Sequence, residues 1–156
     1  MLSVIFSCGL RRGELINMKI TDIDSKRNII NIRHGKGDKD RIVPLSEKIL
    51  TLLREYYKKY RPQEWLFEGS IPGTQYSESS IDKVFKSAKR KARIKILCTL
   101  HSLRHCYATH LLEAGTDLRY IQELLGHKHS KTTEIYTHVT TKSIQKIKSP
   151  FDDLEL

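Results

Sequence analysis

The spacing of apolar residues along the chain predicts a mainly helical fold. Residues 46–60 are the clearest case, because Ser46 is a good N-cap and one helical face would hold Ile49, Leu52, Leu53 and Tyr56. Similar spacing predicts further helices over residues 10–19, 79–93, 102–114, 117–125, 131–138 and 142–148. Gly115 and Gly126 are placed to end two of these helices, and the apolar residues 1–10 are expected to be the end of a core helix.

One segment has the pattern of a β-hairpin instead. Residues 28–33 alternate between apolar and polar positions, residues 34–38 (HGKGD) form a glycine-rich turn, and residues 41–45 run back. The whole pattern predicts an α+β, mainly α fold with one small antiparallel sheet. A length of 156 residues is enough for one domain with a packed core.

The net charge of the chain indicates what kind of molecule it binds. Lys and Arg number 28 against 18 acidic residues, which gives a net charge of +10. Such a surplus attracts polyanions and favours nucleic-acid binding that weakens as salt rises. A basic protein without a nucleic-acid role is the alternative on charge alone. The chain has no apolar run long enough to span a bilayer and no secretory leader, so a soluble, cytoplasmic protein without a membrane partner is expected.

The cysteines do not indicate a disulfide framework or a zinc site. Cys8, Cys98 and Cys106 are odd in number and show no CxxC spacing. Reduced, mostly buried thiols are the prediction.

The helix predicted over residues 79–93 is basic on one side. Residues 79–82 (SSID) resemble a capping box that would open it. At about 100° per residue, one side gathers Ile81, Val84, Phe85, Ala88 and Ala92, and the other side gathers Lys83, Lys86, Arg90 and Arg93. Nothing acidic interrupts the basic side after Asp82, which favours a phosphate-tracking surface over a merely solvated face.

Six polar residues in three separated blocks point to chemistry on a phosphodiester. They are Arg11, Lys36, His101, Arg104, His127 and Tyr136. Together they supply fixed cations for the phosphoryl oxygens, a proton donor for the leaving oxygen and a hydroxyl nucleophile. Metal-free cleavage of a DNA strand requires these three functions.

His101 and Arg104 are three residues apart, so on a helix an imidazole and a guanidinium would approach one phosphate together. His101 and His105 also have the i,i+4 spacing of a helical zinc pair. No glutamate follows as in HExxH and no third ligand is well placed, so zinc is the weaker interpretation.

His127 follows the C-terminus of a predicted helix, where the macrodipole favours a cationic imidazole. Tyr136 lies on a predicted short helix. A free phenol has a pKa near about 10, so this tyrosine would attack phosphorus only if nearby cations or bases help to remove its proton. A half-buried core tyrosine is the alternative for this position.

The order of these blocks resembles the catalytic domain of the tyrosine recombinases, the phage-integrase family. The resemblance rests on residues 9–15 (GLRRGEL), on residues 35–45 (GKGDKDRIVPL), and on the run from HSLRH at 101–105 to YTHV at 136–139. It covers nearly the whole chain. The ELLGH run and the KSPF tail are most similar to integron-type and chromosome-dimer-resolving members.

The resemblance implies a role for each of the six residues. Arg11 and Arg104 would clamp the non-bridging oxygens as charge builds in the pentavalent transition state. His101 and His127 would hydrogen-bond the phosphate and manage the proton of the nucleophile. Arg12 and Glu14 are interpreted as helix-surface or packing residues.

Tyr136 would be the nucleophile, forming a 3′-phosphotyrosyl link and releasing a 5′ hydroxyl. Lys36 in the hairpin turn would protonate that departing oxygen, with Lys39 as the second candidate. The link keeps the energy of a phosphodiester, so a 5′ hydroxyl from another strand can reverse the step without ATP. No metal or other cofactor is implied.

Double-stranded DNA is therefore the expected partner, and a homo-oligomer, a tetramer in the synaptic complex, is expected on it. The expected DNA contacts are Lys39, Arg41, Lys83, Lys86, Arg90 and Arg93. The resemblance also implies a bacterial or phage-derived protein that acts at the nucleoid, in DNA integration or recombination by a mobile element.

The expected domain organisation is a catalytic domain over residues 1–148, lacking its first helices and the N-terminal core-binding domain that members usually carry. Residues 149–156 form a tail that would dock onto a neighbouring protomer, with a frayed end as the alternative. Two alternative functions are a type IB topoisomerase activity and a DNA-binding remnant without efficient cleavage.

Overall fold

The computed structural model describes residues 1–33 and 40–127. In chain order the elements of this part are α1 (Leu2–Cys8), α2 (Arg12–Ile16), the 3-10 turn η1 (Ile20–Asp22), β1 (Ile23–Asp24), β2 (Ile29–Ile32), β3 (Arg41–Pro44), α3 (Glu47–Tyr60), α4 (Glu78–Lys91), α5 (Leu100–Glu113) and α6 (Leu118–Leu125). The predicted α+β, mainly α fold is confirmed.

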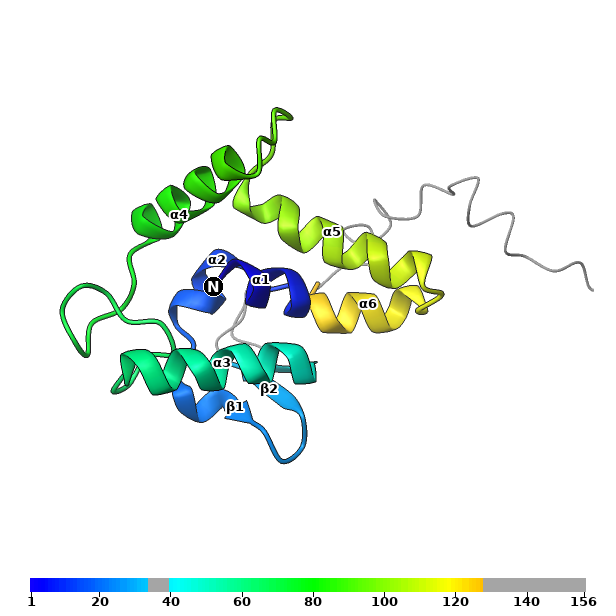
Figure 1. The fold of residues 1–156 in the computed structure, drawn as a ribbon. Coiled ribbons are helices and arrows are strands. Elements are labelled where there is room, and N and C mark those ends of the chain that lie inside the picture. Colours follow the sequence, from blue (N-terminus) through cyan, green and yellow to red (C-terminus); the bar gives the residue numbers. More distant parts are fainter. Residues whose placement is uncertain (34–39, 128–156) are drawn as a thin grey trace, which may run out of the picture.

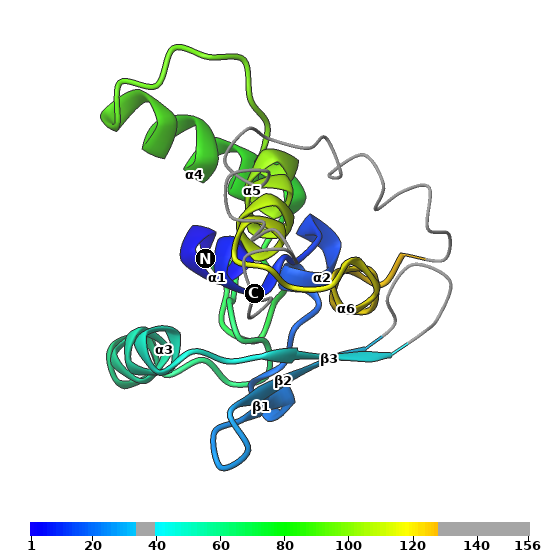
Figure 2. The ribbon, with the colours of Figure 1, turned by 90° about the vertical axis from the view of Figure 1, so that its right-hand side faces the viewer.

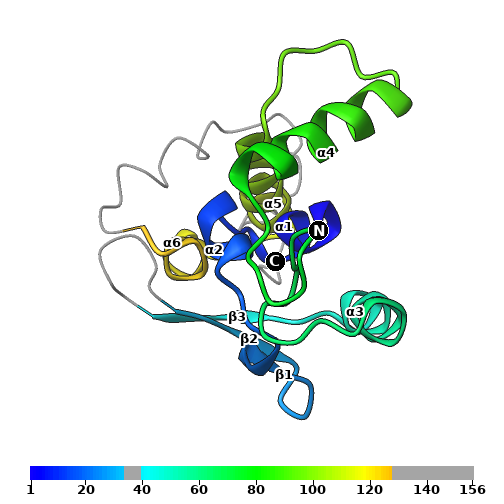
Figure 3. The ribbon, with the colours of Figure 1, turned by 90° about the vertical axis from the view of Figure 1, so that its left-hand side faces the viewer.

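The elements are arranged around α1 and α2. Figure 1 shows α3 and the sheet on one side of this pair, with α4 and α5 on the other. The two side views in Figure 2 and Figure 3 agree, since the sheet and α3 lie at one end of the molecule and α4 at the opposite end. Helix α6 lies between α5 and strand β3, and it contacts both.

The sheet is an antiparallel meander in the order β1-β2-β3. Ile30 pairs with Val43 and Ile32 pairs with Arg41, so the hairpin predicted from alternation is confirmed. Ile30, Ile32 and Val43 turn toward the core and are buried, as a half-buried strand requires. The predicted turn at residues 34–38 lies outside the described residues.

The start of α3 is as predicted, because the Ser46 side chain accepts a hydrogen bond from the backbone nitrogen of Ile49 at 3.3 Å. Its buried face is slightly different from the prediction. Leu52, expected inward, is 51% exposed, and Leu50 is buried in its place. Ile49, Leu50 and Leu53 belong to the main core cluster, and α3 contacts α1 there.

Other helices also begin at residues different from those predicted. The helix expected over residues 10–19 is the shorter α2, which begins at Arg12 and ends at Ile16. Ser77, not Ser79, caps α4, because its hydroxyl accepts from the Ser80 backbone nitrogen at 3.1 Å. Helix α5 begins at Leu100 because Thr99 stands at its N-cap, where the Thr99 backbone nitrogen donates to the Ser102 hydroxyl at 3.0 Å. Runs of Ser and Thr offer several caps, and sequence spacing alone did not select the right one.

The cysteine prediction is partly wrong. Cys8 is fully buried in the core, Cys98 is half-buried, and Cys106 is exposed. Cys106 lies on the outer side of α5, two residues beyond the inward-facing Arg104. No helix within residues 1–33 and 40–127 is both long enough and apolar enough to cross a membrane.

Gly9 is a position where the fold requires glycine. It ends α1 at a φ of 60°, and a Cβ atom there would lie 2.4 Å from Cδ1 of the buried Tyr107 ring. Gly9→Ala is expected to lower the free energy of unfolding by about 2–4 kcal/mol, from overpacking and left-handed backbone strain together. Urea denaturation measures the effect.

Gly13→Ala is the matched control for this substitution. Gly13 lies inside α2 with open space around its missing Cβ, so alanine is expected to raise stability by about 0.5–1 kcal/mol. Equal losses in the two variants would contradict the packing assigned to Gly9.

Candidate active site

Four segments that are distant in sequence meet at one place in the fold. They are the junction between α1 and α2, the start of β3, the first half of α5, and the C-terminal end of α6. Of the six predicted site residues, the described part includes Arg11, His101, Arg104 and His127. The structure brings all four to this meeting point.

Arg104 lies at the centre and is 1% exposed. Its Nη1 donates to the Gly9 carbonyl oxygen at 2.5 Å, and its Nη2 donates to the Leu125 carbonyl oxygen. The guanidinium therefore ties α5 to the end of α1 and the end of α6. His101, one turn earlier, is exposed, so the two side chains differ in depth although they share one side of the helix.

Arg11 is the N-cap residue of α2, and its side chain is 23% exposed. Its Nη1 donates to Oε1 of Glu14 at 2.7 Å, and its Nη2 donates to the Gly126 carbonyl oxygen at 3.1 Å. Arg11 thus faces the same end of α6 as Arg104 and has a more accessible side chain.

Arg41, which was predicted to contact DNA, has a side chain that points into the protein. Its side chain is only 8% exposed, although the residue begins an edge strand. Nε donates to the Leu124 carbonyl oxygen at 2.7 Å, while Nη1 and Nη2 form a fork onto the two oxygens of Glu14 at 2.7 and 2.8 Å. All three nitrogens of this guanidinium donate to protein oxygens, so Arg41 is not placed to track DNA phosphates.

Glu14 is the site residue whose role sequence reasoning missed. Its side chain is 5% exposed, and four hydrogen bonds from Arg11 and Arg41 reach its carboxylate. Burial favours its protonated form, but the bonds and charge of Arg41, followed by those of Arg11, lower its pKa to about 2. The available signal was a capping pattern, because Glu14 is the third residue of α2 and accepts from the Arg11 backbone nitrogen at 2.7 Å.

Three consecutive carbonyl groups at the end of α6 each accept from a different arginine. Leu124 accepts from Arg41, Leu125 from Arg104 and Gly126 from Arg11. The last carbonyls of a helix have no partner within it and carry partial negative charge, so cations stabilise them. This contact fixes the three guanidiniums relative to the backbone that leads into His127.

The pKa values of both histidines, His101 and His127, are lowered, and the result for His127 differs from the prediction. Burial, followed by the charges of Arg104, Arg11 and Arg41, lowers the pKa of His127 to about 4. The cationic form expected from the helix macrodipole is therefore wrong, because burial and three nearby guanidiniums outweigh the dipole. Burial, His105 and the arginines also lower the pKa of His101.

His101 packs against His105 in an edge-on arrangement, with the ring centroids 4.5 Å apart. These were the two residues with metal-pair spacing. Within the described part of the chain, no three His, Cys, Asp or Glu side chains gather closely enough to hold a metal ion.

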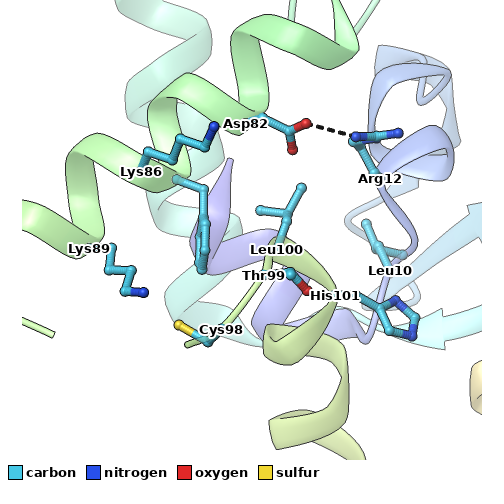
Figure 4. A pocket seen from close by; sticks show the side chains of 10 residues that line it. Leu10, Arg12, Asp82, Lys86, Lys89, Cys98, Thr99, Leu100 and His101 are labelled. Atoms are coloured by element: carbon cyan, nitrogen blue, oxygen red, sulfur yellow. Dashed lines mark hydrogen bonds and ion pairs between the residues drawn. The ribbon is translucent and has the colours of Figure 1, made fainter. Parts of the chain in front are cut away.

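A hollow of about 570 Å³ lies beside His101, between α4, α2 and the start of α5. Figure 4 shows Lys86 and Lys89 on α4 at one side of it, Arg12 across from them and Leu100 on its floor. Arg12 is exposed and is paired with Asp82 at 2.8 Å and Glu78 at 2.5 Å, in line with a surface role.

Only one of the four residues on the predicted basic side of α4 lines this hollow. Lys86 lines it, whereas Lys83, Arg90 and Arg93 are exposed and do not belong to its lining. Lys89 lines it as well and was missed, because it lies between the two faces that helical spacing distinguishes. Lys36, Lys39, Tyr136 and residues 149–156 lie outside the described residues.

The sequence matches one protein family and several of its relatives. Residues 1–143 match the sequence model of the Phage integrase family. The chain is 41% identical over 151 residues to the putative integrase/recombinase y4eF of Sinorhizobium fredii, covering 97% of this chain and 60% of that protein. It is 40% identical over 158 residues to the tyrosine recombinase XerD of Staphylococcus aureus, covering 97% of this chain and 53% of XerD.

Solved structures give the same result. The XerA recombinase superposes with a TM-score of 0.80 at 39% identity, over 92% of this chain and 52% of XerA. The XerH site-specific recombinase, solved on its difH substrate before cleavage, superposes with a TM-score of 0.77 at 30% identity, over 94% of this chain and 44% of XerH. The chain spans about half the length of these relatives.

Proposed function

Because the chain belongs to the phage integrase family, we propose that it is the catalytic part of a site-specific DNA recombinase. In this proposal it cleaves and rejoins duplex DNA through a 3′-phosphotyrosyl intermediate, without a metal ion or ATP. The observation that carries the proposal is the cluster of Arg11, Arg104 and His127 at the end of α6, next to the exposed His101.

The charge of this cluster suits a phosphodiester in its transition state. Three guanidiniums and one carboxylate lie in mutual contact, so the net charge is three minus one, or +2. Attack on phosphorus adds negative charge to the non-bridging oxygens, and fixed cations placed before the reaction stabilise it without reorganisation. Guanidinium groups supply here the charge that a metal ion supplies in other phosphoryl-transfer enzymes.

The chemical step follows from these groups. The Tyr136 oxygen attacks phosphorus and forms a new phosphorus–oxygen bond, and the bond to the 5′ oxygen of the next nucleotide breaks. The phenolic proton leaves with help from a neutral base, a form that the low pKa of His127 maintains at neutral pH. Lys36, or Lys39 in second place, donates the proton that the departing 5′ oxygen takes up.

The hollow beside His101 is the proposed path of the DNA strand. Lys86 and Lys89 line it from α4, and His101 belongs both to its lining and to the arginine cluster. A strand held there would pass from the basic side of α4 to the reacting phosphate. Lys83, Arg90 and Arg93 would meet phosphates farther along the duplex.

Salt dependence tests this path. Replacing Lys86 and Lys89 by Gln is expected to reduce the slope of log K against log salt by about 1.8, since each lost phosphate contact removes about 0.9. The matched control is Lys58→Gln with Lys59→Gln on α3, at the opposite end of the molecule from α4. Similar slopes for the two double variants would place the DNA elsewhere.

The active assembly is proposed to be a homo-oligomer on double-stranded DNA, a tetramer in the synaptic complex, with residues 149–156 docked onto a neighbouring protomer. Residues 1–148 are proposed as the catalytic domain. Solved relatives in the family include XerH on difH DNA both before and after cleavage, which makes DNA the natural substrate class to test.

Trapping of a covalent adduct tests the proposed function without knowledge of the target site. A pool of duplexes with randomised centres and a single nick each is incubated with the full chain, and protein-linked DNA is recovered by phenol partition. Enrichment of one related set of sequences supports a site-specific recombinase. Sequence-independent adducts, together with relaxation of a supercoiled plasmid, would support a type IB topoisomerase instead, and absence of adducts would indicate a DNA-binding remnant.

A further inference from the structure

The Arg41 side chain has a place in the active site that its sequence position does not suggest. It comes from the sheet, whereas Arg11 comes from α2 and Arg104 from α5. Arg41 nevertheless donates to the Leu124 carbonyl oxygen at the end of α6. The next two carbonyl groups along the chain accept from Arg104 and Arg11. It also packs flat on Gly126, where a Cβ would lie 3.2 Å from its Cδ.

Arg41 and Arg11 share one carboxylate. Oε1 of Glu14 accepts from Nη1 of both arginines, and Oε2 accepts from Nη2 of Arg41 and the backbone nitrogen of Arg11. Two carboxylate oxygens offer about four lone-pair positions, so these four bonds saturate Glu14. The orientation of the Arg11 guanidinium therefore depends on a carboxylate that Arg41 fixes from the opposite side.

The charges of this arrangement have a consequence for phosphate binding. A carboxylate that orients Arg11 also cancels one positive charge in the site. Arg41 restores that charge, so the four groups together keep a net +2, the charge of Arg11 and Arg104 alone. Glu14 can thus hold Arg11 without weakening the field on the phosphate.

We propose that Arg41 is a positioning residue for the transesterification, which acts by pairing with Glu14 and by holding the end of α6, without touching DNA. This inference rests on the proposed function. It extends it by assigning a third arginine to the reaction. It also gives Arg41 a role different from that of Lys86 and Lys89, which are proposed to contact DNA directly.

Single-turnover cleavage of a nicked duplex from the selected pool tests this role, with DNA affinity measured separately. Arg41→Gln is expected to slow cleavage at saturating DNA at least 100-fold, while the DNA dissociation constant changes less than threefold. Arg33→Gln is the matched control, because Arg33 flanks the same hairpin, is 58% exposed and pairs with Asp22 at 2.7 Å, outside the arginine cluster. Arg33→Gln is expected to cleave at the wild-type rate once DNA is saturating.

A second substitution distinguishes positioning from the effect of charge alone. The pair Arg41→Gln with Glu14→Gln restores the net charge of +2 but removes the carboxylate that orients Arg11, so the double variant is expected to cleave within threefold of the rate of Arg41→Gln alone. Arg41→Lys keeps the charge but cannot form the two parallel hydrogen bonds to Glu14. Its cleavage rate is expected to lie between those of wild type and Arg41→Gln. A double variant that cleaves at the wild-type rate would show that charge alone explains the defect and would overturn the proposal, as would an Arg41→Gln enzyme within threefold of wild type.

Nuclear magnetic resonance supplies a readout that does not depend on cleavage. The guanidinium signals of Arg11 and Arg104 are expected to be resolved, because both groups are held by hydrogen bonds, and to broaden or merge in Arg41→Gln while staying unchanged in Arg33→Gln. Unchanged signals in Arg41→Gln would contradict the positioning role. A wild-type protein that forms no adduct would refute the proposed function and leave this measurement able to decide on Arg41.

Discussion

Tyr136→Phe is expected to abolish covalent attachment to DNA while leaving DNA affinity within about twofold of wild type. The substitution removes one oxygen, and that oxygen is the proposed nucleophile, so no phosphorus–oxygen bond to the protein can form. A phenylalanine ring keeps the size and apolar character of the side chain. The measurement is the fraction of nicked duplex that migrates with the protein in a denaturing gel.

The other tyrosines provide the control for this result. Tyr120→Phe removes the same oxygen from a side chain that is 69% exposed and lies on α6 near the site. It is expected to form adducts at the wild-type level. Equal trapping by Tyr136→Phe and wild type would remove Tyr136 from the reaction, and loss of trapping in Tyr120→Phe alone would assign the nucleophile to α6.

Arg104→Ala is expected to have the second-largest effect, because it removes both a proposed phosphate ligand and the hydrogen bonds that join α5 to the ends of α1 and α6. Loss of one donor to a developing oxyanion commonly costs about 2.7–4 kcal/mol, which slows cleavage about 10²- to 10³-fold. The same substitution leaves the Gly9 and Leu125 carbonyl groups without their buried donor. Each unsatisfied buried group costs about 1–3 kcal/mol, so the free energy of unfolding is expected to fall as well.

The two effects of Arg104→Ala are separated with a control of matched stability. Ile121→Ala removes a fully buried side chain from α6, in the apolar cluster with Tyr107, Ala108 and Leu125, and is expected to cost about 2–5 kcal/mol. Single-turnover cleavage well below both melting temperatures is then compared. Ile121→Ala is expected to cleave near the wild-type rate, and a loss as large as that of Arg104→Ala would mean that stability alone explains the defect.

The secondary structure was largely predictable because it depends on local spacing. The two strands of the hairpin and the extent of α3 follow from alternation, from helical periodicity and from one serine cap. The starts of α4 and α5 were less predictable, since each has more than one hydroxyl residue that can serve as a cap. Local signals define an element well and its first residue poorly.

The depth of the site residues was not predictable in the same way. Arg104 and Arg41 look like surface cations in the sequence, and both are buried because carbonyl groups and a carboxylate from distant segments receive their donors. The predicted cationic form of His127 is wrong for a different reason, because burial and the charges of the nearby arginines lower its pKa. These partners lie as far as 95 residues away along the chain, and helical spacing carries no information about them.

Glu14 shows what a closer reading of the sequence could have found. An acidic residue three positions after an arginine, at the start of a short helix, is a capping pattern that binds both to the same helix end. In a chain with a net charge of +10, an acidic residue next to arginines is a candidate for holding their side chains in place. Its second partner, Arg41, could be found only from the tertiary structure.

The central claim is that a tyrosine attacks a phosphate held by protein cations without a divalent ion. Mass spectrometry of peptides from the trapped adduct, formed in the presence of EDTA, tests it most directly. The nucleotide mass is expected on the peptide that contains Tyr136, joined to the 3′ end of the cleaved strand, with a yield equal to that without EDTA. Loss of the adduct in EDTA, or attachment to any other residue, would contradict it.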